Sequence, residues 1–378
     1  MTTPSSDTLD RLAVALDQLK AEVRADLGER DVTYIHRMIR LQRSLEVAGR
    51  LLLHVSMTPV GFLLGSSSLA VSKILENMEI GHNVMHGQYD WMNDPSIHSS
   101  RYEWDTACDA QSWKRTHNHE HHAYTNILGK DRDYGYGLMR LDDRVPWEPH
   151  YRFQLVYYYL LSSLFQWGVA LHELEIEKLR SGELTLADKK DFGREFLRKA
   201  GKQIFKDYVF FPALAGGMFW KVAAGNALAN VTRNFWASTV IFCGHFTGDA
   251  EAFTEAECAN ETRGHWYYRQ LRGSSNFEGN ALLHVMSGHL SHQIEHHLFP
   301  DIPAHRYPDI SVRVRAICQE LDIPYNTGSF WNQYKTVVKR IWRYSRPTRG
   351  TTPAVRPVAD TPAPLRVEDR HLPVAIAV

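Results

Sequence analysis

The stretch His289-Leu-Ser-His292-Gln-Ile-Glu-His296-His297 contains four histidines in nine residues. Two further stretches have the same character, His82-Asn-Val-Met-His86 and His117-Asn-His119-Glu-His121-His122. Together with the isolated His245, these windows hold eleven of the twenty histidines in the 378-residue chain. Neutral imidazole is a common protein ligand for transition metals. The clustering therefore predicts a metal site.

The spacing of these histidines favours two metals over one. On a helix, positions i and i+4 lie on one face, so His82 and His86 can converge on one point, as can His117 and His121. Adjacent residues on an α-helix point about 100° apart. A double histidine can therefore serve two centres. Two of the three stretches end in such a pair, which indicates a binuclear site.

The order HxxxH, HxxxHH and [His/Gln]xxHH resembles the histidine boxes of the membrane fatty-acid desaturase family. The segment 293–300 (QIEHHLFP) is similar to the third box of front-end and linoleoyl-type members, and the segment 113–126 to the second box. The resemblance extends over roughly residues 40–320 and is closest to actinobacterial acyl-CoA desaturases. It implies an all-α fold. The expected architecture is a polytopic membrane bundle of about four transmembrane helices, with a cytoplasmic helical cap that carries the boxes.

The resemblance also implies a set of iron ligands. These are His82, His86, His117, His121, His122, His245, His296 and His297. His292 is counted with these ligands because it supplies HxxxHH spacing, and Gln293 is a possible ligand because it occupies the family position; which of the two leads the third box stays open. Candidates for further ligands, or for partners that orient the ligands, are His119, His289, Glu120, Glu295 and Asn126. The aspartates Asp131 and Asp133 are expected to shape a turn.

Hydropathy gives conflicting signals about the membrane. The mean hydropathy of −0.36 argues against a polytopic protein. The runs Leu51–Ser72 and Phe153–Leu171, however, lack charged residues, and Tyr208–Trp220 and Asn234–Gly244 are shorter apolar runs. A helix needs about 20 apolar residues to span a bilayer. Membrane helices are therefore expected for these runs, and buried core helices of a soluble protein are the alternative.

The chain divides into three expected parts. Residues 1–30 form an amphipathic segment, with a helix from about Thr8 to Ala25, residues 31–343 form the desaturase domain, and the Pro-, Thr- and Arg-rich residues 344–378 form a disordered tail. Because the first residues are polar, no signal peptide is expected. Equal numbers of basic and acidic residues, 43 each, give no bias toward nucleic acid. We expect a multi-pass protein of the cell (inner) membrane, with the boxes and both termini cytoplasmic.

The function implied by the resemblance is that of an acyl-CoA (fatty acid) desaturase. Such an enzyme uses O2 and two iron ions to insert a cis double bond into a saturated or monounsaturated acyl chain, here at a stearoyl-type (Δ9) or linoleoyl-type position. No haem, flavin or iron–sulfur motif is evident in the sequence. The electrons are therefore expected from a separate NAD(P)H-dependent oxidoreductase or a ferredoxin. The basic pair Lys339 and Arg340 in a C-terminal helix is a candidate contact for this donor, or for a membrane surface.

Substrate contacts are less clearly encoded. Lys114 and Arg115 flank box two and are candidates for binding the phosphates of an acyl-CoA or a lipid-linked acyl substrate; a solvated basic face is the alternative. Tyr158 and Trp167 are candidates for lining an acyl tunnel, and core packing is the alternative. Two other functions stay open. One is a di-iron lipid hydroxylase or alkane monooxygenase, and the other is a zinc-binding membrane hydrolase or receptor.

Overall fold

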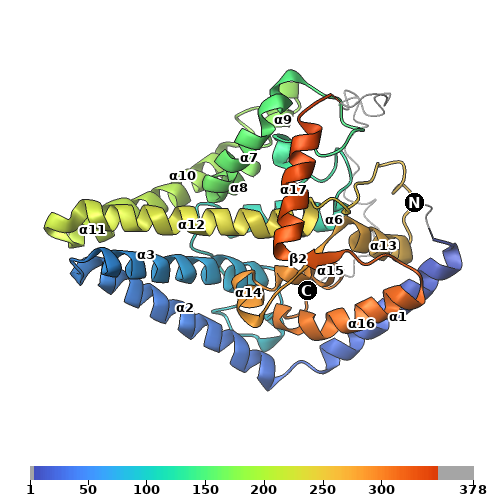
Figure 1. Ribbon diagram of the computed structural model, residues 1–378, viewed down its shortest axis with the longest axis horizontal. Coiled ribbons are helices and arrows are strands. Elements are labelled where there is room, and N and C mark those ends of the chain that lie inside the picture. Colours follow the sequence, from blue (N-terminus) through green and yellow to red (C-terminus); the bar gives the residue numbers. More distant parts are fainter. Residues whose placement is uncertain (1–3, 348–378) are drawn as a thin grey trace.

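The computed structural model describes residues 4–347 of the chain, and helices make up most of this part (Figure 1). The long helices α2 (Glu29–Val55), α3 (Pro59–Ile74) and α12 (Phe219–His245) pack along one another toward one end of the molecule. Shorter helices gather as a cap at the other end. The predicted helical fold class is thus confirmed, whereas most of the predicted disordered tail lies outside the described residues.

Helices α2 and α3 form a tight hairpin. Thr58 caps α3 by accepting a hydrogen bond from the Gly61 N–H, and Pro59 occupies the first helical turn, where it needs no donor. A Cβ atom added to Gly49 would lie 2.8 Å from the Leu69 nitrogen, so glycine permits the close approach of the two backbones. The charge-free run 51–72, predicted as one spanning helix, therefore contains the hairpin turn.

The second predicted helix, 153–171, is broken at Leu164. It consists of α7 (Gln154–Ser163) and α8 (Phe165–His172). Next to α12 lie α10 (Lys190–Phe205), the π-helix η6 (Lys206–Phe210), α11 (Phe211–Leu214) and the 3-10 turn η7 (Gly216–Met218). Within residues 4–347, no helix has both the length and the apolar character needed to cross a membrane. The structure therefore does not confirm the polytopic part of the predicted fold.

The cap is built on the N-terminal helix α1 (Ser6–Ala25), which confirms the predicted amphipathic helix. Its buried face of Leu9, Leu12, Leu16 and Leu19 packs against α13 (Arg263–Gly273) and α16 (Tyr307–Glu320). The parallel strands β1 (Asn276–Glu278) and β2 (Thr327–Ser329) join the segments around box three. Short elements complete the cap and its connections: α4 (Asn83–Met85), α5 (Ala110–Trp113), α6 (His122–Tyr124), α9 (Ile176–Ser181), α14 (Ala281–Met286), α15 (Gln293–Leu298), η2 (Asp90–Met92), η4 (Gly135–Gly137), η5 (Pro149–Phe153), η8 (Leu290–His292) and η9 (Ala304–Arg306).

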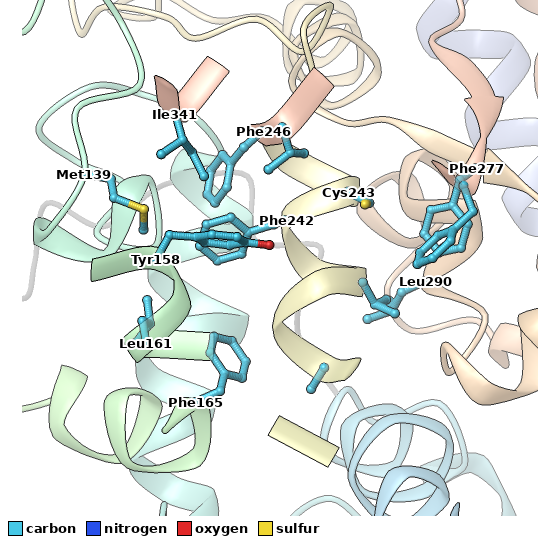
Figure 2. Packing of buried hydrophobic residues seen from close by; sticks show 14 of the residues in the cluster. Met139, Tyr158, Leu161, Phe165, Phe242, Cys243, Phe246, Phe277, Leu290 and Ile341 are labelled. Carbon is cyan, nitrogen blue, oxygen red and sulfur yellow. The ribbon is translucent and has the colours of Figure 1, made fainter. Parts of the chain in front are cut away.

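The largest core cluster joins the end of α12 to α7 and the C-terminal helix α17 (Phe330–Tyr344). Figure 2 shows Phe242 at its centre, with its ring 4.9 Å from that of Tyr158 and 4.9 Å from that of Phe246. Arg340 of α17 donates hydrogen bonds to the carbonyl oxygens of Leu141, Thr247 and Ala250. Arg340 thereby holds α17 in place, so it is not a free surface charge for the predicted donor contact.

Candidate metal centre

The π-helix η1 (Leu75–His82) ends at the first histidine of box one, and the π-helix η3 (Lys114–His121) carries most of box two. His86 caps the C-terminus of α4, and His122 begins α6. A π-helix, closed by i→i+5 hydrogen bonds, advances by roughly 80° per residue, where an α-helix advances by about 100°. Positions i+4 and i+5 then lie on either side of position i. In agreement, the rings of His121 and His122 both lie 5.1 Å from the ring of His117. The wider turn therefore directs both members of the double histidine toward one region.

The histidines form overlapping groups in which all ligand atoms lie within 4.8 Å of one another. The groups are His82, His86, His117 and His296; His121, His245 and His297; His122, His296 and His297; and His117, His121 and Asp133. The third group shares members with each of the first two. Four segments that are far apart in the sequence thus bring together all eight histidines that the family resemblance implied as ligands.

The second group has the spacing expected around a metal. The Nε2 atom of His245 lies 3.3 Å from Nε2 of His121 and 3.1 Å from Nε2 of His297. The Nδ1 atom of His297 faces the Gln270 Oε1 at 3.0 Å, and Nδ1 of His121 faces a carboxylate. Since these oxygens only accept, both Nδ1 atoms carry the proton and both Nε2 atoms present lone pairs. Two imidazole nitrogens on one metal, each at about 2.1 Å, stand roughly 3 Å apart.

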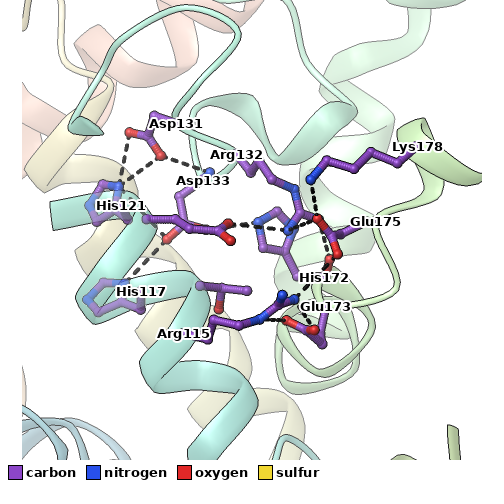
Figure 3. A network of polar contacts seen from close by, with 12 residues as sticks. Arg115, His117, His121, Asp131, Arg132, Asp133, His172, Glu173, Glu175 and Lys178 are labelled. Carbon is purple, nitrogen blue, oxygen red and sulfur yellow. Dashed lines mark hydrogen bonds and ion pairs between the residues drawn. The ribbon is translucent and has the colours of Figure 1, made fainter. Parts of the chain in front are cut away.

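Two aspartates that follow box two orient its histidines (Figure 3). The Asp131 carboxylate accepts from His121 Nδ1 at 3.0 Å, and the Asp133 carboxylate lies 3.3 Å from His117 Nδ1. Asp131 also accepts from the backbone N–H groups of Asn126 and Asp133, so it shapes the expected turn as well. The sequence prediction missed the contacts with histidine. A carboxylate on the outer nitrogen fixes the tautomer and raises the basicity of the inner one.

Although burial opposes it, the neighbouring Asp131 carboxylate raises the pKa of His121. Burial keeps the other seven clustered imidazoles neutral. It lowers the pKa of His82 to about 3 and holds the pKa values of His86, His122, His296 and His297 well below the usual value. Neutral imidazole is the form that binds metal.

Several buried nitrogens of this cluster have no hydrogen-bond partner among residues 4–347. They include Nε2 of His86, Nε2 of His117 and both ring nitrogens of His122 and His296. A buried polar atom without a partner is costly, by about 1–3 kcal/mol. Metal ions at the centre of the groups would satisfy these lone pairs together. Imidazole-rich sets suit iron among other transition metals, so the residues fit the iron pair implied by the sequence.

Comparison with known proteins identifies the family. A family profile described as "Fatty acid desaturase" matches residues 57–329. A protein named "NADPH-dependent stearoyl-CoA 9-desaturase" from Mycobacterium tuberculosis is 49% identical over 345 residues, which cover 90% of this chain and 81% of the relative. The chain belongs to the fatty acid desaturase family. A more distant relative is the "sn-1 linoleoyl-lipid 6-desaturase" of Synechocystis, 28% identical over 272 residues, which cover 70% of this chain and 74% of that protein. The resemblance drawn from the boxes, including its actinobacterial branch, is confirmed.

At the leading position of box three, the desaturase brings Gln293 to the histidine groups. The Gln293 Nε2 lies 2.9 Å from the His245 Nε2, and the Gln293 Oε1 is buried without a partner among the described residues. A Cβ atom added to Gly244 would lie 2.8 Å from the Gln293 side chain, so glycine there leaves room for it. His292 lies outside the groups. Its Nδ1 is 3.2 Å from the Ser291 hydroxyl, and its ring packs at 4.9 Å from that of His284.

Two further histidines of the boxes also lie outside these groups. His119 is exposed, and neither it nor His289 belongs to a group. The His289 Nδ1 contacts the Glu79 carboxylate at 3.1 Å, and the same carboxylate accepts a hydrogen bond from the Tyr34 hydroxyl. His289 has a left-handed backbone conformation with φ of 57°. Glu79 thus anchors a histidine of box three to the π-helix of box one.

The three remaining candidate ligands, Glu295, Asn126 and Glu120, make contacts outside the histidine groups. Glu295 is fully buried and accepts from Asn276 and Tyr325. Asn126 donates to the carbonyl oxygens of Glu251 and Gly273. The Glu120 carboxylate lies 3.6 Å from the Arg132 guanidinium. These contacts fix the segments that carry the boxes. None of the three side chains belongs to a metal-capable group of the described residues.

A largely apolar cavity reaches the metal groups. Trp104, Trp113, Phe165, Val169, Ile241 and Leu290 line it, together with His82, His117, His121 and His245. The four candidate substrate residues do not line this cavity. Lys114 donates to the Ser99 carbonyl oxygen, and Arg115 pairs with Glu173 (Figure 3). Tyr158 belongs to the core around Phe242, and Trp167 packs against a separate buried cluster.

Proposed function

We propose that this chain is an acyl-CoA desaturase that places a cis double bond at the 9 position of a stearoyl-type chain. The observation that carries the proposal is that four histidines of the metal-capable groups line an otherwise largely apolar cavity. An apolar cavity accommodates an alkyl chain, and the histidines would hold metal beside that chain. The position of the double bond follows from the name of the 49% identical mycobacterial relative.

Two irons would be held by the eight clustered histidines, with Gln293 as the leading residue of box three. His82, His86, His117 and His296 would serve one iron, and His121, His245 and His297 the other, with His122 near both. When bound, the iron pair supplies the O2-derived oxidant that is needed to break unactivated C–H bonds.

The protein's own contribution is geometry and exclusion of water. Asp131 and Asp133 hold the protons on the outer nitrogens of His121 and His117 and so keep the inner nitrogens free. The rings of Trp113 and His117 stack at 4.4 Å, which fixes the orientation of that imidazole at the cavity wall. Apolar walls restrain the alkyl chain and keep water away from the reacting carbons.

The electrons are proposed to come from NADPH through a separate oxidoreductase or a ferredoxin, as the chain shows no motif for a haem or a flavin. The name of the mycobacterial relative includes dependence on NADPH. We propose acyl-CoA as the substrate, whereas the name of the cyanobacterial relative refers to a lipid-linked chain.

We also infer that residues 31–343 form the catalytic domain, with the end of the helical bundle away from the cap (Figure 1) embedded in the cell membrane. Large apolar side chains are exposed around the hairpin turn and the facing end of α12, with exposed fractions of 69% for Val55, 80% for Met57 and 80% for Trp220. Extended apolar patches mark surfaces that meet a membrane or a partner. The cap with the boxes, α1 and the tail would then face the cytoplasm. Extraction of host membranes with carbonate tests this placement, since the inference requires the protein to stay in the pellet.

Product analysis tests the reaction. The purified, iron-loaded protein is incubated with stearoyl-CoA, NADPH, a reductase system and O2, and the acyl products are analysed by mass. Loss of two hydrogens supports desaturation. Gain of one oxygen would identify a hydroxylase instead. Hydrolysis with zinc in place of iron would identify the hydrolase alternative.

A further inference from the structure

The cavity that reaches the histidines has a polar end. Along α12, its lining changes from His245 at the metal groups, through the apolar Ile241, to Arg233 and Asn234. Gln166 of α8 joins the lining beside these two residues. Arg233 is 2% exposed and Gln166 is 9% exposed, so both lie inside the helical bundle. A buried guanidinium at the end of a cavity suited to alkyl chains requires a physical explanation.

The polar end is rigidly held. The Arg233 Nε donates to the Asn234 Oδ1 at 2.9 Å, and the Arg233 Nη2 donates to the Gln166 Oε1 at 2.6 Å. The Asn234 Nδ2 donates in turn to the Ser163 carbonyl oxygen at 2.8 Å, next to the break between α7 and α8 at Leu164. The broken helix therefore provides the position from which Gln166 meets Arg233. Movement of either side chain would leave buried polar atoms without partners.

We propose that Arg233 and Gln166 close the acyl cavity with a polar wall that sets the longest chain the enzyme accepts. This inference rests on the proposed function and names a determinant of its substrate range. Each additional methylene that enters an apolar pocket favours binding about fourfold. A methylene in contact with the guanidinium and the amide does not gain this binding free energy. It also excludes water from these polar groups, which is unfavourable. Chains that reach the wall are therefore accepted, and longer chains are disfavoured.

The helix geometry gives the scale of the cavity. Arg233 and His245 are twelve residues apart on α12, which corresponds to roughly 18 Å along the helix axis. The two side chains occupy part of this length. At roughly 1.3 Å per methylene in an extended chain, the remainder accommodates on the order of ten carbons. The wall thus lies at a distance that matches the methyl half of a stearoyl-type chain.

The test replaces the polar wall by an apolar one. Arg233→Met and Gln166→Met each remove a polar group with little change in length. Iron-loaded variants are given C16, C18, C20 and C22 acyl-CoA, and kcat/KM is measured for each chain. Binding of C18 and C20 acyl-CoA to the iron-free proteins is measured in parallel. We expect the C20-to-C18 ratio to rise at least fivefold in both kcat/KM and affinity. If Arg233→Met fails to fold, Gln166→Met alone decides the test.

Asn230→Leu is the matched control. Asn230 is buried on the same helix and donates to Asp207 at 3.0 Å, but it does not line the cavity. This variant should leave the C20-to-C18 ratio unchanged. Equal losses on all chains in Arg233→Met and Gln166→Met would show that the wall only stabilises the fold, and would overturn the inference.

Two further outcomes separate this inference from the proposed function. If the unaltered protein desaturates acyl-CoA but neither variant changes the ratio, only the inference fails. If the unaltered protein desaturates no acyl-CoA, the proposed function fails first. A preference of the unaltered protein for a C18 chain that ends in a carboxylate, over one that ends in a methyl group, would make Arg233 an anion receptor. That result would also contradict the chain-length wall.

Discussion

Both carboxylate oxygens of Asp131 lie 3.0 Å from the Nδ1 of His121. The same carboxylate accepts a hydrogen bond from the backbone N–H of Asn126. The loop after box two thus holds the aspartate in place, and the aspartate in turn orients the imidazole. The Nε2 of His121 is left to meet His245 at 3.3 Å. This relationship links a turn that follows box two to a histidine at the end of a helix more than a hundred residues later.

Replacement of Asp131 should therefore weaken metal binding without removing a ligand. Asp131→Asn keeps the size of the side chain but loses the charge that holds the proton on His121 Nδ1, and we expect iron affinity to fall by about 10–100-fold. Iron per chain is measured after dialysis against a graded series of chelator concentrations. Asp188→Asn is the control, because Asp188 is exposed and contacts only the nearby Thr185. Equal iron retention in both variants would show that Asp131 does not contribute to metal binding.

Gly244→Ala should impair the enzyme through Gln293. The new methyl group would lie 2.8 Å from the Gln293 side chain, so the glutamine would move away from His245. We expect turnover to fall at least tenfold while the protein still folds. Gly201→Ala on α10 is the control. A Cβ atom there meets nothing within 4 Å, so this change should leave turnover intact and stabilise the helix by up to about 1 kcal/mol. Normal turnover in Gly244→Ala would show that the placement of Gln293 is unimportant.

Either His292 or Gln293 could hold the leading position of box three, and single substitutions distinguish the two. His292 lies outside the metal-capable groups, whereas His297 belongs to two of them. His292→Ala should retain most of the desaturation activity, and Gln293→Ala and His297→Ala should lose it. Activity and iron content are compared in the three variants at equal expression. Loss of iron in His292→Ala, with iron retained in Gln293→Ala, would reverse the assignment of the leading position.

Acid should destabilise the iron-free protein. Burial lowers the pKa of His82 to about 3 and depresses the pKa values of His86, His122, His296 and His297. The unfolded chain takes up protons at the ordinary histidine pKa, about 6.5. The unfolded state therefore binds more protons between this pH and the folded pKa, and the free energy of unfolding falls as pH drops below about 6.5. The slope is up to about 1.4 kcal/mol per pH unit for each group.

Thermal unfolding of the chelated protein at pH 7.5 and pH 5.5 measures this effect. We expect a lower Tm at pH 5.5. Burial raises the pKa values of Glu295 and Glu76 to about 7, and the Asp131 carboxylate raises that of His121. These three groups act in the opposite direction, but the five histidines outnumber them. An unchanged or higher Tm at pH 5.5 would show that the histidines are not neutral and buried together.

The sequence contained enough to predict the helical fold, the family and the eight clustered histidines, because the spacing within the boxes is local and specific. It did not reveal that η1 and η3 are π-helices, since apolar periodicity does not distinguish an i→i+5 turn from an i→i+4 turn. The break at Leu164 depends on Asn234, which lies on another helix and satisfies the freed carbonyl of Ser163. The structural role of Arg340 depends on carbonyl groups of distant loops. Contacts of this kind are set by tertiary packing and leave no local pattern.

The most direct test of the central claim is the mass and double-bond position of the product formed from stearoyl-CoA by the purified, iron-loaded protein with NADPH, a reductase system and O2. The account predicts an 18-carbon product lighter by two hydrogens, with the double bond at carbon 9, formed only when about two irons are bound per chain. A product heavier by one oxygen, or desaturation that persists after zinc replaces iron, would contradict it.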